Sequence, residues 1–221
     1  MIFVTGDTHG EFTRFSSHNF QKGKSLSKDD FVIVCGDFGL IWQNIPSKEE
    51  KYWINWLDSK PWTTLFVDGN HSNHPRLNSL EKIEKFDGIV GKVSDSIFHL
   101  RRGEIYNIEN RSVFCMGGAA SYDKHLRVEG ISWWKEEIIS NDDINNALNH
   151  LEGISFIDII ITHTLPKNLV PFYQKEIDPT TIFLQHIFDN FNWNHWFCGH
   201  WHFDETFDKN VQVLYHKIVK V

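Results

Sequence analysis

The chain has 221 residues, of which 41% are hydrophobic and 14% aromatic. This composition supports one sizeable packed core and excludes a disordered chain. The net charge of −7 argues against a non-specific nucleic-acid binder, because such binding depends on an excess of Lys and Arg.

The first part of the chain alternates short apolar strands with a helix. Ser47–Lys60 has apolar residues at helical spacing, and Ser47 begins a motif that resembles a capping box. A strand, a helix and a strand in this order predict a parallel βαβ unit. The predicted strands, each followed by a Gly-containing turn, are Ile2–Thr5, Phe31–Cys35 and Thr63–Val67.

The middle of the chain changes character, because three strands there are joined by short turns and are predicted to be antiparallel: Ile97–Leu100, Glu104–Ile108 and Ser112–Met116. A polar loop, Gly117–Gly130, follows them. We then predict helices at Asn141–Leu151, with Asn141 as its cap, and at Thr180–Phe191. The remaining predicted strands are Phe156–Thr162, Trp196–Cys198 and a terminal hairpin of Glu205–Asp208 with Gln212–His216. These elements predict one mixed α/β domain.

Three cysteines, Cys35, Cys115 and Cys198, are far apart in the sequence and lie in apolar runs. This pattern predicts buried, reduced thiols in a cytoplasmic protein.

Met1–Thr5 has no basic start and no cleavage-like site, so we expect a strand there rather than a signal peptide. No apolar stretch approaches the roughly 18 residues that a membrane-spanning helix needs, and no membrane partner is expected.

Five short polar motifs follow the predicted strands, at the position where α/β folds bind ligands. Their carboxylate, amide and imidazole groups suit Mn, Fe or Zn better than Ca, which prefers oxygen ligands alone. In two of the motifs, one residue separates two ligand-type side chains, so in an extended segment both point to the same side. The motifs are Gly6-Asp7-Thr8-His9-Gly10, Gly36-Asp37, Gly69-Asn70-His71, Thr162-His163 and Gly199-His200-Trp201-His202.

Each motif alone is weak evidence, since a Gly-Asp pair after a strand is usually a turn and a single His is usually a surface or core residue. Chance does not explain all five motifs in the same structural position, and we therefore predict a metal site. An Asp carboxylate has two oxygen atoms and can bridge two cations. Two cations about 3.5–4 Å apart can clamp an in-line displacement and generate hydroxide near neutral pH.

The ordered series of motifs, which spans residues 7–202, resembles the calcineurin-like metallophosphoesterase superfamily. The resemblance implies a single domain over residues 1–221, with two mixed β-sheets packed as a sandwich and flanked by helices, a four-layer αββα fold. It also implies an enzyme that hydrolyses a phosphodiester or phosphomonoester through a dinuclear metal centre and a bridging hydroxide. The expected cofactors are two divalent ions, Mn or Fe/Zn.

The resemblance assigns a role to each motif residue. Asp7, His9 and His202 would bind the first metal, Asn70, His163 and His200 the second, and Asp37 would bridge them. His71 would be the general acid that protonates the leaving oxygen, a task suited to an imidazole with a pKa near its ordinary value of about 6.5.

Two positions depart from the family pattern. Ser72 stands where many relatives have an acidic residue after Gly-Asn-His, so we expect weaker orientation of His71. Phe38-Gly39 stands where protein Ser/Thr phosphatases continue with a motif that contains an Arg phosphate clamp. We therefore discount a protein phosphatase and the related dinucleoside tetraphosphatase, and mildly prefer a diester to a monoester.

The Gly117–Gly130 loop supplies candidates for substrate binding. Lys124 and Arg127 could hold an anionic part of the substrate, or could pair with Asp123 and Glu129 in a solvated loop. Arg14, after the first motif, is a weaker candidate. Trp133-Trp134 is either a stacking platform for a base or, as we prefer, part of the core.

The expected partner is a small phosphorylated substrate, with cyclic and other nucleotides as the first candidates. One alternative is a metal-dependent nuclease, which the acidity and the lack of a basic stripe disfavour. Another is a catalytically silent protein-binding scaffold, which the complete ligand set disfavours. The sequence leaves the metal pair, the natural ester and the oligomeric state open.

Overall fold

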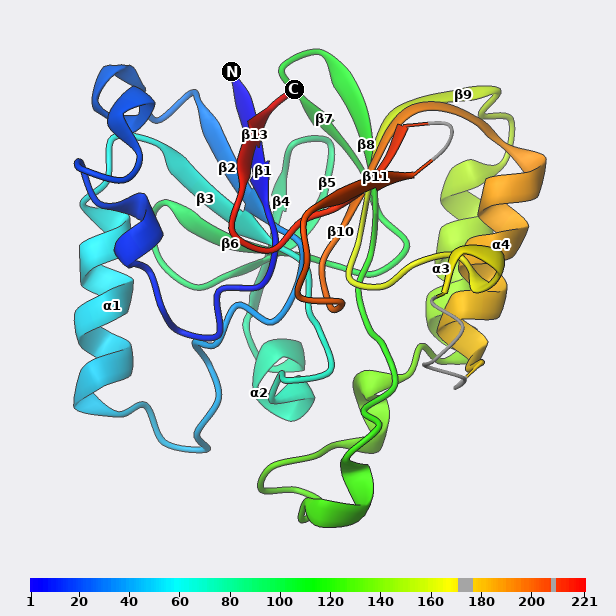
Figure 1. The fold of residues 1–221 in the computed structure, drawn as a ribbon, viewed down its shortest axis with the longest axis horizontal. Coiled ribbons are helices and arrows are strands. Elements are labelled where there is room, and N and C mark those ends of the chain that lie inside the picture. The colour runs from blue at the N-terminus through cyan, green and yellow to red at the C-terminus, as the bar shows by residue number, and fades with distance from the viewer. Residues whose placement is uncertain (171–176, 208–209) are drawn as a thin grey trace.

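The computed structural model describes residues 1–170, 177–207 and 210–221, and in these residues the strands form two mixed sheets (Figure 1). The strands are β1 (Ile2–Thr5), β2 (Phe31–Val34), β3 (Thr63–Phe66), β4 (Glu81–Lys85), β5 (Gly88–Lys92), β6 (Ile97–Leu100), β7 (Ile105–Ile108), β8 (Arg111–Met116), β9 (Phe156–Thr162), β10 (Asn192–Cys198), β11 (Glu205–Phe207), β12 (Val211–Val213) and β13 (Ile218–Lys220). The larger sheet has the order β13-β1-β2-β3-β6-β5-β4, and the smaller has the order β11-β12-β10-β9-β8-β7.

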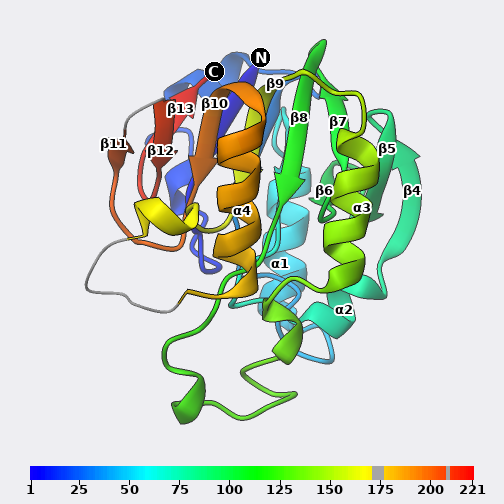
Figure 2. The same ribbon diagram turned by 90° about the vertical axis from the view of Figure 1, so that its right-hand side faces the viewer.

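Helices cover the outer faces of both sheets. Helix α1 (Lys48–Asp58) lies on the larger sheet, while α3 (Asn141–Leu151) and α4 (Pro179–Asn190) lie side by side on the smaller one (Figures 1 and 2). The short α2 (His74–Asn78) follows β3. The result is four layers, helix, sheet, sheet and helix, which confirms the fold that the resemblance implies.

The main core lies between the two sheets. Val4, Ile33 and Leu65 of the larger sheet belong to the same buried cluster as Ile159 and Phe197 of the smaller one. Strands β1, β2 and β3 are buried on both faces, which explains why their sequences are continuous apolar runs rather than alternating ones. Each such side chain contributes about 1.5–3 kcal/mol on burial, so the strand ends that follow them are held on a rigid base.

Helix caps agree with the sequence in one case and differ by one residue in another. The Ser47 hydroxyl accepts a hydrogen bond from the backbone N–H of Glu50 at 3.0 Å, so the predicted cap of α1 is confirmed. The prediction of Asn141 as the cap of α3 is wrong, because Ser140 is the cap. Its hydroxyl accepts from Asp143 N, and the Asp143 carboxylate accepts from Ser140 N, which completes a capping box.

The predicted pairing of the middle strands is partly wrong. Strands β7 and β8 pair antiparallel as expected, but β6 belongs to the larger sheet, where it pairs parallel with β3 and antiparallel with β5. The turn Arg101-Arg102-Gly103 therefore carries the chain from one sheet to the other. The hairpin β4–β5 was not predicted, because β4 is an exposed edge strand with a single apolar residue, Ile83.

Three smaller expectations can also be compared with the structure. Strands β11 and β12 form the expected antiparallel hairpin, although Asp208 and Lys209, which we assigned to it, lie outside the described residues. All three cysteines are buried and free, as predicted. In the described part of the chain, no helix has the length and apolar character that a bilayer-spanning segment requires.

Candidate metal centre

The side chains predicted to bind metal converge where the carboxyl ends of parallel strands meet. Strands β1, β2 and β3 run parallel in the larger sheet, and β9 and β10 run parallel in the smaller one. Each predicted ligand follows one of these five strands, so the two sheets bring the motifs together at one edge of the sandwich. We call these residues the ligand cluster: Asp7, His9, Asp37, Asn70, His163, His200 and His202.

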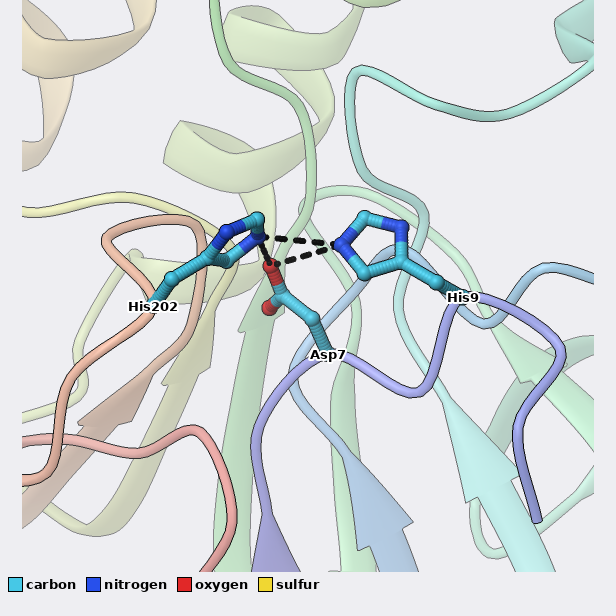
Figure 3. A group of neighbouring side chains, drawn as sticks. All are labelled: Asp7, His9 and His202. Atoms are coloured by element: carbon cyan, nitrogen blue, oxygen red, sulfur yellow. Dashed lines mark hydrogen bonds and ion pairs between the residues drawn. The ribbon is translucent and has the colours of Figure 1, made fainter.

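Asp7, His9 and His202 form the first ligand group (Figure 3). Asp7 Oδ2 lies 3.0 Å from His202 Nε2 and 3.6 Å from His9 Nε2. The two Nε2 atoms face each other at 3.0 Å. Asp7 is fully buried, whereas both imidazoles are partly open to solvent, so this group is reached from outside through its histidines.

The second ligand group lies beside the first and shares Asp7 with it. Asp7, Asp37 and His163 have ligand atoms close enough together to hold one ion. Asp37 lies 3.5 Å from His163 through Oδ1 and 3.9 Å from His9 through Oδ2, so its carboxylate stands between the two groups. Asn70 Oδ1 completes this side, at 2.9 Å from His163 Nε2 and 3.0 Å from His200 Nδ1.

Hydrogen bonds behind the imidazoles decide which ring atom faces the centre. His163 Nδ1 donates to the Cys35 carbonyl at 2.8 Å, which leaves Nε2 directed at Asn70. His200 Nε2 lies 2.9 Å from the Tyr122 hydroxyl, which leaves Nδ1 directed at the same amide oxygen. Protons on these two nitrogens therefore occupy the position that a cation would take, since the amide oxygen can only accept.

Two glycines make room for the carboxylates. A Cβ atom at Gly199 would lie 2.0 Å from Asp7 Oδ1, and one at Gly69 would lie 2.2 Å from Asp37 Oδ1. The close approach at Gly199 also allows the backbone N–H of the next residue, His200, to donate to Asp7 Oδ1 at 2.8 Å. Gly199 thus allows the two sheets to approach closely, and Gly69 does the same for the ends of the neighbouring strands β2 and β3 in the larger sheet.

Several ligands have left-handed backbone geometry. The φ angles are 47° for His9, 43° for Asp37, 69° for His200 and 55° for His202. Such geometry costs of order 1–3 kcal/mol per non-Gly residue and persists where the surrounding structure imposes it, typically at functional sites. The clustering of four such residues in the ligand cluster indicates a site built for function.

Charge is balanced within the cluster by protons. Burial alone would raise the pKa values of Asp7 and Asp37, but His163 and the surrounding donors outweigh it and lower both, that of Asp37 to about 2. Burial alone would lower the pKa of His163, but the Asp37 and Asp7 carboxylates raise it to about 9. Burial and the charge of His163 lower the pKa of His200 to about 3, so that imidazole is neutral.

The residues present fit divalent cations. Asp7 Oδ2 is buried and has no hydrogen bond with good geometry, although His202 Nε2 lies 3.0 Å away. An orphaned carboxylate oxygen flanked by imidazole nitrogens is what a bound cation would satisfy. The mixed set of oxygen and nitrogen atoms matches Mn, Fe or Zn.

His71 lies at the rim of the cluster and is not one of its ligand groups. Its backbone N–H donates to Asp37 Oδ1 at 2.8 Å, and its Nε2 lies 3.3 Å from Arg127 Nη2. Burial and the Arg127 charge lower the pKa of His71, while Asp37 acts in the opposite direction. Ser72 donates nothing to the imidazole; its hydroxyl accepts from Gly69 N at 3.1 Å and closes the turn instead.

A chain of buried hydrogen bonds holds the Asn70 amide. Asn70 Nδ2 donates to the Ser121 hydroxyl at 3.0 Å, and that hydroxyl donates to Glu137 Oε2 at 2.6 Å. Since the amide nitrogen is used there, Oδ1 must face the histidines. Burial raises the pKa of Glu137.

A second buried network ties the Gly69-Asn70-His71 turn to the segment that follows β8. Arg102 binds Asp68 through Nε at 2.9 Å and Nη2 at 2.6 Å. The same guanidinium donates to the carbonyls of Glu136, Glu137 and Ile138. Residues 117–138 extend away from the sandwich at the lower side of Figure 1, so this network fixes the base of that segment.

The three predicted substrate-binding residues are placed differently. Arg127 is held by Asp123 at 2.7 and 2.8 Å and reaches His71. Lys124 is exposed. Arg14 donates to the carbonyls of Asp7 and Tyr215 and to the Thr5 hydroxyl. None of the three is among the described residues that line the cavity of about 170 Å³ over the ligands, although Asp123, which holds Arg127, is one of them.

Sequence reasoning missed several residues around the cluster. Tyr122 touches His200, Ser121 touches Asn70, and Glu137 acts through Ser121. The pairing of Arg127 with Asp123 was one of the two alternatives that the sequence left open. We preferred the core for Trp133-Trp134; Trp134 is buried and packs edge to face on Trp42, whereas Trp133 is half-buried. The only signal available was the glycine-rich start of the Gly117–Gly130 loop.

Comparison with known proteins agrees with this geometry. A family model described as calcineurin-like phosphoesterase matches residues 1–204. No curated protein matches the chain.

Proposed function

Because the chain belongs to the calcineurin-like phosphoesterase family, we propose that it is a dinuclear metal-dependent hydrolase of small phosphodiesters or phosphomonoesters. One observation carries the proposal: two adjoining ligand groups share Asp7, with Asp37 between them. The complete set argues against a silent scaffold, whose ligands would have been free to change.

The proposed roles follow the positions of the side chains. Asp7, His9 and His202 would bind one cation, Asn70, His163 and His200 the other, and Asp37 would bridge them. Two divalent cations here would supply positive charge to the phosphoryl oxygens and activate a water molecule. We propose Mn or an Fe/Zn pair, which the mixed donor set supports.

His71 is the proposed general acid. In the reaction, a water oxygen bonds to phosphorus and releases a proton to solvent, and the bond from phosphorus to the leaving oxygen breaks. His71 donates its proton to that oxygen and is reprotonated from solvent. Its lowered pKa in the free protein works against this role. A phosphate anion bound beside the imidazole would raise the pKa again, because a nearby negative charge favours the protonated form.

Arg127 is the proposed contact for a non-bridging phosphate oxygen, because it lies beside His71 and is held by Asp123. Lys124 would add long-range attraction from its exposed position. Arg14 would contribute indirectly, by holding the backbone of Asp7. The proposed substrate is small, with nucleotides as candidates, since the net charge of −7 disfavours nucleic acid.

We propose that the protein works in the cytoplasm. The support is chemical: three free cysteines are buried in the core, a pattern typical of a reducing compartment.

The test is a metal-supplemented activity screen. Purified protein with Mn should hydrolyse bis-p-nitrophenyl phosphate or p-nitrophenyl phosphate and at least one member of a nucleotide panel. Asp37→Asn serves as the blank, because it keeps the shape but weakens the proposed bridge. Activity of this variant equal to that of the wild type would overturn the two-metal assignment.

His71→Ala separates an enzyme from a binding scaffold. Under the proposal, turnover falls by about 10²-fold or more while the bound metal, measured by elemental analysis, stays unchanged. A variant with undiminished turnover would show that another group supplies the proton.

A further inference from the structure

A cleft opens beside the ligand cluster, and Tyr122 is not among the described residues that line it. It has a volume of about 360 Å³ and is lined by His9 and His71 together with residues of the segment 39–53. His71 also lines the smaller cavity over the ligands, so the two spaces meet at this imidazole. A volume of this size is in the range of small-molecule sites.

Two tryptophans supply the walls of this cleft, which we call the Trp cleft. Trp42 lies with its ring centroid 6.3 Å from that of His71 and packs edge to face on the buried Trp134, at 5.1 Å and 86°. Trp53 of α1 also lines the cleft and packs on Phe12, with 5.5 Å between the ring centroids. Flat aromatic walls bind flat rings well, because every base or aryl group offers a stacking face.

The wall that carries Trp42 is held in place by α2 and the residue before it. Asn73 Nδ2 donates to the Trp42 carbonyl at 2.8 Å and to Asn44 Oδ1 at 3.0 Å. Arg76 binds both carboxylate oxygens of Glu50, at 2.9 and 2.7 Å. The cleft is therefore formed before any ligand arrives.

The charge of the Trp cleft is negative. Glu49 is exposed, lines the cleft and has no ion-pair partner among the described residues. Glu50 lines it too, but its charge is neutralised by Arg76. The described lining contains no Lys or Arg, so an anionic group placed beside Glu49 would be repelled by its carboxylate.

We propose that the Trp cleft binds the leaving group of the ester and selects one that carries a flat ring and no negative charge, as a nucleoside does. This rests on the proposed function, because His71 marks the leaving-group side only if it is the acid. The substrate class is then a phosphate ester of a neutral, ring-bearing alcohol, rather than a polyphosphate or an acidic sugar phosphate.

Three substrates with the same leaving oxygen test the proposal: uridine 5′-monophosphate, orotidine 5′-monophosphate and ribose 5-phosphate, each also as its methyl diester with release of the alcohol measured. Wild-type kcat/KM should be highest for the uridine ester. The orotidine ester adds a carboxylate, and the ribose ester lacks the ring, so both should be cleaved at least about tenfold less well.

Substitutions of Trp42 and Glu49 test which residue causes the preference for a ring and which causes the preference for an uncharged leaving group. Trp42→Ala should lower kcat/KM for the uridine ester about tenfold and leave the ribose ester within about twofold, while Trp42→Phe keeps most of the preference. Glu49→Gln should improve the orotidine ester relative to the uridine ester. The matched control is Glu84→Gln, which removes an exposed carboxylate on the edge strand β4. It should change neither the preference for the ring nor the preference for an uncharged leaving group.

Equal kcat/KM for the uridine and ribose esters, or an equal loss for both in Trp42→Ala, would overturn the proposal. A binding measurement tests the Trp cleft independently of the proposed enzymatic function. If no ester is hydrolysed, including p-nitrophenyl phosphate, the enzyme proposal fails, and the cleft is judged by quenching of Trp fluorescence. Quenching by uridine 5′-monophosphate that is lost in Trp42→Ala supports the cleft; quenching no stronger than with ribose 5-phosphate rejects it.

Discussion

The ligand cluster and the rim above it are held by different means. Asp7, Asp37 and His163 are buried at the ends of strands that the sheets fix on both faces. The rim, made of Trp42, His71, Tyr122, Asp123 and Arg127, lies on loops and is held by side-chain contacts. Changes in the cluster should therefore remove metal, whereas changes in the rim should alter rate or specificity with metal retained.

The largest expected effect comes from filling the space that the cluster needs. In Gly199→Ala the new Cβ would lie only 2.0 Å from Asp7 Oδ1. The Asp7 carboxylate must therefore move away from both ligand groups. We expect loss of at least one metal ion per chain and a fall in kcat of about 10³-fold or more. Elemental analysis and steady-state kinetics measure both.

The control is Gly153→Ala, which also adds a methyl group, in left-handed backbone at φ 75°, but with nothing within 4 Å. It should lose about 1 kcal/mol of stability and keep its metal. If both variants lost metal alike, general destabilisation rather than the geometry of Asp7 would be the cause.

Next in size is the buried ion pair of Asp68 and Arg102, which ties the Gly69-Asn70-His71 turn to residues 136–138. Asp68→Asn removes the closer of the two carboxylates that pair with the buried Arg102 and leaves only Asp143, at 3.2 Å, so it should lower the free energy of unfolding by about 2–3 kcal/mol. Urea unfolding at pH 7 measures this. Asp95→Asn, which breaks the exposed pair with Lys92 at 3.2 Å, should produce no measurable change.

The same pair predicts a pH dependence. Burial alone would raise the pKa of Asp68, but Arg102 outweighs it and holds the pKa well below its ordinary value. The stabilisation is therefore complete above the unfolded-state pKa of about 3.8 and is lost as the pH falls below it. The stability difference between wild type and Asp68→Asn should shrink at pH 3; a constant difference would assign it to packing.

A smaller effect is expected where a buried loop residue supports a residue of the ligand cluster. Ser121→Ala removes the link between Asn70 and Glu137 and frees the amide to rotate. Metal affinity should fall about tenfold, as for other residues that orient ligands. The control is Ser132→Ala, in the same segment 117–138, where the hydroxyl accepts a hydrogen bond from Val128 N. It should leave metal affinity unchanged. Equal affinity in both variants would mean that His163 and His200 alone fix the amide.

The smallest effects belong to the outer rim. Arg127→Ala should raise KM about fivefold with metal content unchanged, since it removes one charged contact to a phosphate oxygen. Lys124→Ala, from an exposed position, should change KM less than about twofold. A larger effect at Lys124 than at Arg127 would reverse the assignment of the anion contact.

The contrast between cluster and rim also explains what the sequence could predict. Every residue of the ligand cluster follows an apolar strand, and all but His163 belong to a Gly-containing motif, so a local pattern predicts that these seven side chains meet at one edge of the sandwich. The sheet to which β6 belongs, by contrast, depends on pairing with β3 and β5 across the fold. The Asn70–Ser121–Glu137 chain and the approach of Trp42 to His71 depend on how loops fold back, which no local pattern encodes.

The left-handed backbone at His9, Asp37, His200 and His202 has a consequence for how metal is taken up. These residues follow strands that are fixed in the two sheets, so we expect no segment to become ordered when a cation binds. Uptake then requires only exchange of protons for metal on ligands that are already aligned. We expect the apo and loaded proteins to share one backbone, with exchange kinetics set by proton release and solvent access through His9 and His202.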